Sequence, residues 1–85
     1  MSPEQSRAAR GWLSWSQQDL AERAGVGLST VRDFEALRRQ PIGNNIAAMR
    51  RAFESEGIIF MFDATSRATG IAVTNAGAPA AASET

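Results

Sequence analysis

The sequence predicts a mainly α-helical fold, in which four short helices are followed by a C-terminal β-hairpin or strand. Three observations support this prediction. Residues that start helices occur at Ser2 and Ser16, apolar residues recur at helical spacing as far as Phe53, and an unbroken apolar run over 58–62 follows Gly57. The chain has 85 residues, so we expect one domain with a modest core.

The first helix is expected over residues 3–13. Ser2 can accept a hydrogen bond as the N-cap, Pro3 suits the first helical position, and Gln5 completes a capping box. The apolar residues near this helix are expected to be buried or half-buried, including both tryptophans. They are Ala9, Leu13, Trp12 and Trp15.

Two further helices are expected over about 17–24 and 28–37, joined by a tight turn. Gly25 can adopt the left-handed conformation that such a turn requires. Ala21 is small enough for two helices to cross closely, and Val31 can fill the space between them. This spacing is typical of a helix-turn-helix, which presents its second helix to another macromolecule.

A loop and a fourth helix are expected next. Pro41 disfavours helical backbone at the residue before it, which predicts a loop over residues 38–43. Asn44 or Asn45 is expected to cap the fourth helix, and Gly57 to end it. This helix has an apolar stripe at helical spacing, consisting of Ile46, Met49 and Phe53.

A strand is expected over residues 58–62, with a return strand over 70–73. Ile59 and Met61 alternate with three other apolar side chains, so both faces of the first strand are apolar. The helices can cover only one face, and a lone hairpin is marginally stable. We therefore expect Ile59 and Met61 to form a dimer or partner interface. The expected organisation is a helix-turn-helix domain over 1–57, a hairpin extension over 58–73 and a disordered tail over 74–85.

The composition argues against enzymatic and metal chemistry. The chain has no cysteine and no histidine, so we expect no thiolate or imidazole metal site, no cofactor and no catalytic activity. No apolar run is long enough to span a membrane, and the first residues are too polar for a secretory signal, which favours the cytoplasm. Nine arginines, with no lysine, balance nine acidic residues, so any positive patch must be local.

Several residues occur together in a combination that one family shares. They are Arg10, Ser16-Gln17, Leu20-Ala21, Gly25-Val26, Val31 and Phe34-Glu35, followed by an Arg-Arg-x-Pro loop. In this combination residues 4–56 resemble the lambda-repressor-like helix-turn-helix regulators of the XRE/Cro family. The resemblance implies a compact bundle of four or five helices, here four, that binds operator DNA as a dimer, with helix 28–37 in the major groove.

The resemblance also implies roles for individual residues. Gln17 matches a residue that hydrogen-bonds a DNA phosphate, and Arg10 and Glu35 match a structural ion pair between the first and third helices. Arg38 and Arg39 follow the third helix, where loops of the family contact the DNA backbone. The candidate DNA-binding or partner-binding residues are Gln17, Gln18, Leu28, Ser29, Thr30, Arg32, Asp33, Arg38 and Arg39.

Two functions are open at this point. The first is a small transcriptional regulator that binds double-stranded operator DNA as a dimer. The second is a protein of the same fold that regulates transcription by protein contact, such as an antiactivator that masks a transcriptional activator. The helix-turn-helix pattern favours the first function, which we prefer. The zero net charge and the doubly apolar strand are typical of the second.

Overall fold

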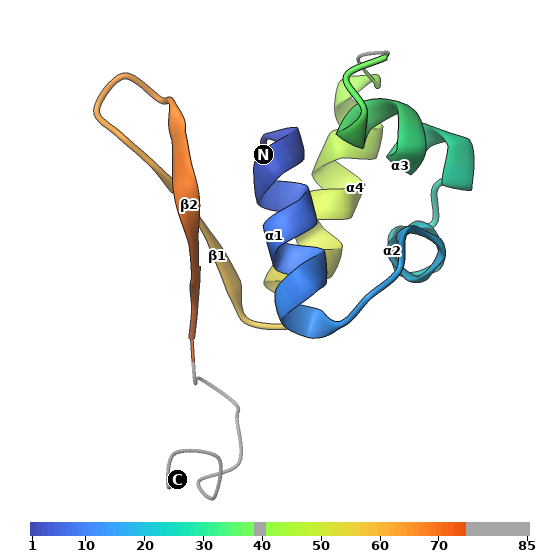
Figure 1. Cartoon of the computed structure of the whole chain (residues 1–85), viewed down its shortest axis with the longest axis horizontal. Helices are drawn as coiled ribbons and strands as arrows, with labels where there is room; N and C mark the ends of the chain where they lie inside the picture. The colour runs from blue at the N-terminus through green and yellow to red at the C-terminus, as the bar shows by residue number, and fades with distance from the viewer. Residues whose placement is uncertain (39–40, 75–85) are drawn as a thin grey trace, which may run out of the picture.

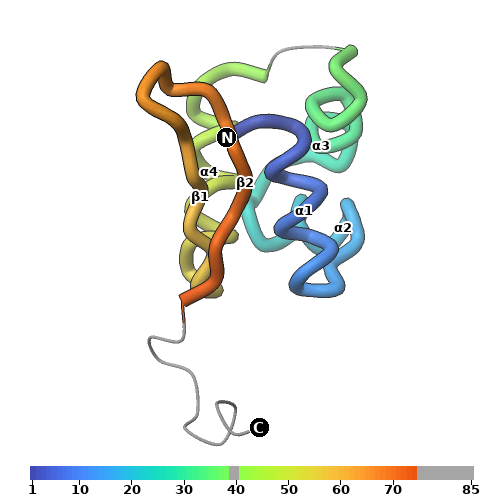
Figure 2. The backbone as a smooth tube through the Cα atoms, turned by 60° about the vertical axis from the view of Figure 1, so that its left-hand side comes forward, coloured from blue at the N-terminus to red at the C-terminus, as the bar shows by residue number. Residues whose placement is uncertain are grey.

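The computed structural model of the chain describes residues 1–38 and 41–74. Within these residues the order of elements is α1 (Pro3–Leu13), α2 (Gln17–Ala24), α3 (Leu28–Glu35), α4 (Gly43–Glu54), β1 (Ile58–Phe62) and β2 (Ala68–Val73). The two strands form an antiparallel hairpin. The hairpin and the α2–α3 pair lie on opposite sides of α1 (Figures 1 and 2). The predicted mainly α fold with a C-terminal hairpin is confirmed.

Capping boxes start the first two helices where the sequence predicted helix starts. Ser2 Oγ accepts the backbone N–H of Gln5 at 3.0 Å, and Gln5 Oε1 accepts the backbone N–H of Ser2 at 2.9 Å. Ser16 and Asp19 form the same pair of hydrogen bonds at the start of α2. Gly25 ends α2 with a φ of 70°, in the left-handed conformation. These local signals fix both ends of α2 and therefore the point at which α3 begins.

The core lies between the helices and one face of the hairpin. Ala21 is 2% exposed and Val31 is fully buried, which confirms their predicted packing positions. Trp15 stacks on Phe53 with ring centroids 5.5 Å apart, and Phe53 meets Phe60 edge to face at 5.9 Å. This aromatic row connects the α1–α2 linker to α4 and β1. The buried apolar residues are Ala9, Leu20, Ala21, Val31, Phe34, Met49, Phe53, Ile58 and Phe60.

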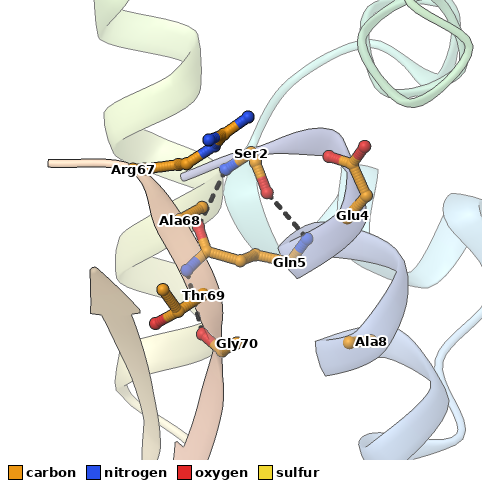
Figure 3. Close-up of a pocket in the computed structure, with 8 residues that line it drawn as sticks. All are labelled: Ser2, Glu4, Gln5, Ala8, Arg67, Ala68, Thr69 and Gly70. Carbon is orange, nitrogen blue, oxygen red and sulfur yellow. Dashed lines mark hydrogen bonds between the residues drawn. The ribbon is translucent and has the colours of Figure 1, made fainter. Parts of the chain in front are cut away.

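Gln5 connects α1 to the hairpin. Met61 pairs with Gly70, but the next residue of β1, Phe62, pairs with Ala68, so β2 carries one extra residue as a bulge. The side chain of Gln5 donates through Nε2 to the carbonyl oxygens of Met61 and Gly70, at 2.9 Å each. Figure 3 shows this side chain reaching from α1 to Gly70. A buried amide therefore holds the hairpin to α1 at the bulge.

The predictions for Trp12 and for the start of α4 were wrong. Trp12 is 64% exposed, although Ala9, one helical turn before it, is fully buried. Neither Asn44 nor Asn45 caps α4. The helix begins at Gly43, after Ile42 as N-cap, and both asparagines lie in its first turn. The carbonyl of Ile42 already accepts the first helical hydrogen bonds, so the helix starts before either asparagine.

The ends of α3 and the start of β2 also differ from the prediction. α3 ends at Glu35 rather than near Leu37, because Leu37 adopts a left-handed φ of 59°. β2 begins at Ala68 rather than at residue 70, since Asp63 accepts backbone hydrogen bonds across the turn and closes it early. The predicted tail, apart from Thr74, lies outside the described residues.

Candidate nucleic-acid interface

One side of α3 is packed against the bundle and the other is free. Val31 and Phe34 are buried, and Leu28 is partly buried against the core. Helical spacing brings four residues together on the opposite side, which we call the α3 ridge: Ser29, Arg32, Asp33 and Ala36. Ser29, Arg32 and Ala36 are exposed, and Asp33 is half-buried. Thr30, beside the ridge, is also half-buried. The α3 ridge is therefore available to another molecule.

A single buried carboxylate, Glu35, fixes α3 to the first two helices. Its side chain is 2% exposed. Arg10 donates to it through Nε at 2.9 Å and through Nη2 at 2.6 Å. Ser6 Oγ donates to it at 2.5 Å, and Gln17 Nε2 at 3.1 Å. The side chain of Arg7 donates to the backbone carbonyl of the same residue. The end of α3 is thus held by side chains from both α1 and α2.

These hydrogen bonds keep Glu35 ionised. Burial by itself would raise the pKa of this carboxyl. The hydrogen bonds from Arg10, Ser6 and Gln17 outweigh burial and lower the pKa below its ordinary value of 4.5. Arg10 also donates to the backbone carbonyl of Trp15 at 3.1 Å, so the same guanidinium holds the α1–α2 linker. The structure therefore brings Arg10 and Glu35 together as a largely buried ion pair.

The sequence pattern alone did not predict the contacts of Ser6 and Arg7 with Glu35. Ser6 lies one helical turn before Arg10 and on the same side of α1 as Ala9. A polar residue at a buried position normally has a hydrogen-bonding partner, which is the signal that could have identified Ser6. The exposed Arg7 gives no such signal, because its partner is a backbone carbonyl at the end of another helix.

The side chains at the start of α2 form more hydrogen bonds within the fold than the sequence predicted. Gln17 is half-buried and bonded to Glu35, and Gln18 donates to Glu22 at 2.8 Å. Asp19 accepts the backbone N–H of the N-cap residue, and this hydrogen bond lowers the pKa of its carboxyl. The amide of Gln17 has a second N–H, so a phosphate contact is compatible with its bond to Glu35.

Part of the positive charge is engaged within the fold. The guanidinium of Arg23 lies over the ring of Trp15, 4.5 Å from its centroid, and forms a 3.6 Å ion pair with Glu56. Arg50 forms a 2.8 Å ion pair with Glu54 on the same helix. Arg23 therefore connects α2 to the residue Glu56 just after α4, Arg50 lies beside Phe60 and Phe62 of β1, and the charge of both arginines is partly neutralised.

Positive charge remains free at the C-terminal half of α3. The side chains of Arg32 and Arg38 are exposed and form no hydrogen bond or ion pair with any residue in 1–38 or 41–74. The backbone N–H of Arg38 donates to the carbonyl of Asp33 at 2.9 Å, which fixes the chain just past the helix. Arg39 lies outside the described residues.

Residues 7–56 match the family model described as Helix-turn-helix, which covers more than half of the chain. The chain belongs to the helix-turn-helix family. This membership confirms the resemblance to the lambda-repressor-like regulators of the XRE/Cro family. No curated protein matches the chain. The family is one of DNA-binding regulators, and α2, the turn at Gly25 and α3 are the motif for which it is named.

This helix-turn-helix chain also has an exposed apolar sheet face. Ile59 and Met61 are 48% and 46% exposed on the side of β1 that faces away from the core. Their partners across the hairpin are the small residues Ala72 and Gly70. The outer face of the hairpin therefore has a raised row of two large side chains beside a low row of two small ones.

Residues 1–38 and 41–74 contain no cluster of acidic side chains suited to holding a metal ion. In the same part of the chain, every helix is too short or too polar to cross a membrane.

Proposed function

We propose that this chain is a small transcriptional regulator that binds operator DNA, with α3 in the major groove. The observation that supports this proposal best is the α3 ridge, which is exposed while the same helix is fixed from behind by Glu35. The major groove of B-DNA accepts an α-helix, and a helix fixed in orientation can align its side chains with base edges. Family membership agrees with this use of α3.

The distribution of charge supports DNA rather than a neutral partner at this surface. The chain has a net charge of zero, but several of its arginines are engaged in the fold. Arg32 and Arg38 are free at one end of α3 and suit a phosphate-lined groove. In this proposal Arg32 contacts a base edge, while Arg38, Arg39 and Gln17 contact the DNA backbone.

A salt titration tests the proposal. Binding of the full chain to duplex DNA from its own promoter region is measured by fluorescence polarisation at several salt concentrations. Each phosphate contact contributes a slope of about −0.9 to the dependence of log affinity on log salt. We expect Arg38→Ala to weaken binding to all duplexes equally and to reduce that slope by about 1.

Arg67→Ala is the matched control, because Arg67 is an exposed arginine in the turn between β1 and β2. The hairpin lies on the other side of α1 from α3 (Figure 1). It removes the same charge from the chain, and we expect affinity and salt slope to stay unchanged. Absence of DNA binding by the unmodified chain at low salt would reject the proposal. Equal effects of the two substitutions would reject the role of Arg38.

We further propose that the chain acts as a dimer through the outer face of the hairpin. The raised row of Ile59 and Met61 fits the low row of Ala72 and Gly70 when a second copy is related by a two-fold axis. We expect Ile59→Asp with Met61→Asp to give monomers in sedimentation equilibrium, and Ala64→Asp, in the exposed turn, to leave the association unchanged. A wild-type chain that is monomeric at high concentration would contradict this arrangement.

A second candidate function is regulation through a protein partner, such as masking of a transcriptional activator. The specific observation in its favour is that two large apolar residues are exposed here: Leu37, directly before Arg38, at 75%, and Ile42, the N-cap of α4, at 68%. Apolar residues next to arginine are typical of protein-binding surfaces. In a reporter strain, Leu37→Ser with Ile42→Ser would abolish regulation under this alternative, whereas Arg32→Ala would abolish it under DNA binding.

A further inference from the structure

Asp33 is an acidic residue of the helix-turn-helix surface whose side chain has no partner among the described residues. Among the described acidic side chains, only Glu4 and Asp33 form no hydrogen bond or ion pair. Glu4 lies on α1 beside the cleft with β2 (Figure 3). Asp33 lies on the α3 ridge, next to Arg32. The acidic residues that have partners are Asp19, Glu22, Glu35, Glu54, Glu56 and Asp63.

The chemistry of a carboxylate restricts what Asp33 can contact in DNA. An ionised carboxylate only accepts hydrogen bonds, and it is repelled by phosphates. In the major groove the hydrogen-bond donors are the amino groups of cytosine and adenine, and an acidic side chain pairs with the cytosine N4 amino group. A sequence without such a group at this position leaves the carboxylate desolvated and unpaired.

The α3 ridge can bring Asp33 close to the bases. Small residues stand at both ends of the ridge. Ser29 lies one helical turn before Asp33, and Ala36 lies one turn after Arg32. Small side chains at these positions let the helix axis approach the groove. Arg32 and Asp33 are adjacent in the chain, so a guanidinium that favours guanine and a carboxylate that favours cytosine would meet neighbouring base edges.

We propose that Asp33 is a specificity-determining residue, which accepts a hydrogen bond from a cytosine amino group in the major groove and disfavours sequences that lack one. This inference rests on the proposed binding of α3 to DNA. The negative charge of Asp33 lowers the affinity for DNA in general, and only a cytosine compensates by donating a hydrogen bond. Specificity therefore comes from repulsion as much as from attraction.

The test is selection from a pool of random duplexes by the full chain, followed by sequencing. The variant Asp33→Asn removes the charge and keeps the shape of the side chain. The matched control Glu4→Gln removes the other unpartnered carboxylate, which lies on α1. We expect the wild type and Glu4→Gln to select a cytosine at one position of each site, and Asp33→Asn to lose that preference while keeping the others.

Binding measurements then give the size of the effect. When the selected cytosine–guanine pair is replaced by thymine–adenine, we expect the wild type to lose about fivefold or more in affinity, as for a typical mismatched base pair. Asp33→Asn should discriminate much less between the two duplexes and should bind unselected DNA more tightly than the wild type. Thermal unfolding of the variant is expected to match the wild type, because the side chain of Asp33 has no partner among residues 1–38 and 41–74.

The outcomes separate the two proposals. If the wild type binds no duplex, both the proposed function and the role of Asp33 are rejected. If the wild type selects a sequence and Asp33→Asn selects the same one with equal discrimination, DNA binding stands and the role of Asp33 is rejected. If the wild type binds DNA but enriches no particular sequence, the role of Asp33 is rejected as well.

Discussion

Replacing Arg10 with methionine is expected to destabilise the whole helix-turn-helix. The substitution keeps the length of the apolar part of the side chain and removes two hydrogen bonds to Glu35, of 2.9 Å and 2.6 Å. The carboxylate of Glu35, which is 2% exposed, is left with Ser6 and Gln17 as side-chain donors. A buried charge without its ionic partner is among the more costly defects that a single substitution creates.

The size of the effect follows from the burial of the pair. Removing one partner of a buried ion pair costs about 3–5 kcal/mol. The side chain of Arg10 is 18% exposed, so water reaches part of the pair and the lower end of that range applies. A loss of about 3 kcal/mol corresponds to a fall in Tm of about 12–24 °C for a domain of this size. Total stabilities are only about 5–15 kcal/mol, so the variant would be partly unfolded at elevated temperature.

Urea unfolding followed by far-UV circular dichroism measures this change in the free energy of unfolding. Arg51→Met is the control, because Arg51 is exposed on α4, and a change within about 0.5 kcal/mol is expected there. The double variant Arg10→Met with Glu35→Met should be more stable than the sum of the single effects predicts, since it leaves no charge unpaired. The reasoning is refuted if Arg10→Met costs no more than Arg51→Met.

Three further predictions concern the ends of elements and the buried carboxylate. Gln5→Leu removes the two hydrogen bonds to the hairpin and should lower the free energy of unfolding by about 2–3 kcal/mol. Backbone hydrogen exchange in β2 should become faster. Unchanged exchange in β2 would contradict the role of Gln5. Because the pKa of Glu35 is lower in the folded chain, its contribution is complete above the ordinary value of 4.5 and is lost as the pH falls below it. The urea midpoint of unfolding, measured at a series of pH values, should fall as the pH drops below 4.5. The fall should be smaller in Glu35→Gln. Gly25→Ala should cost about 1–2 kcal/mol in thermal unfolding, since Gly25 has a φ of 70° and an added Cβ would meet nothing within 4 Å; a much larger cost would indicate a packing clash.

The parts of the fold that sequence reasoning predicted are those fixed by neighbours in the chain. The boxes at Ser2 and Ser16 and the turn at Gly25 depend on residues three or four positions apart. The start of α4 was placed too late because asparagine favours N-caps in general, whereas here Ile42 takes that position without a side-chain bond. Asn44 and Asn45 therefore lie within the first turn of α4 and not at its N-cap.

The contacts that escaped prediction join residues far apart in the sequence. Gln5 was identified as a capping residue, and nothing local indicates that its amide also reaches Met61 and Gly70. The exposure of Trp12 depends on which side of α1 the hairpin covers, which periodicity in one helix cannot decide. Within the candidate site, the exposed ridge of α3 follows from helical spacing, but the bond between Gln17 and Glu35 requires the relative placement of two helices.

The stacking of Trp15 between Arg23 and Phe53 gives the chain an internal optical reporter. Its indole stands at the junction of α1 and α2, whereas Trp12 is mostly in water. A Trp12→Phe variant has one emitting indole, whose spectrum and quenching report whether α2 still lies against α4. Loosening of the motif could then be followed in dilute solution without attaching a dye.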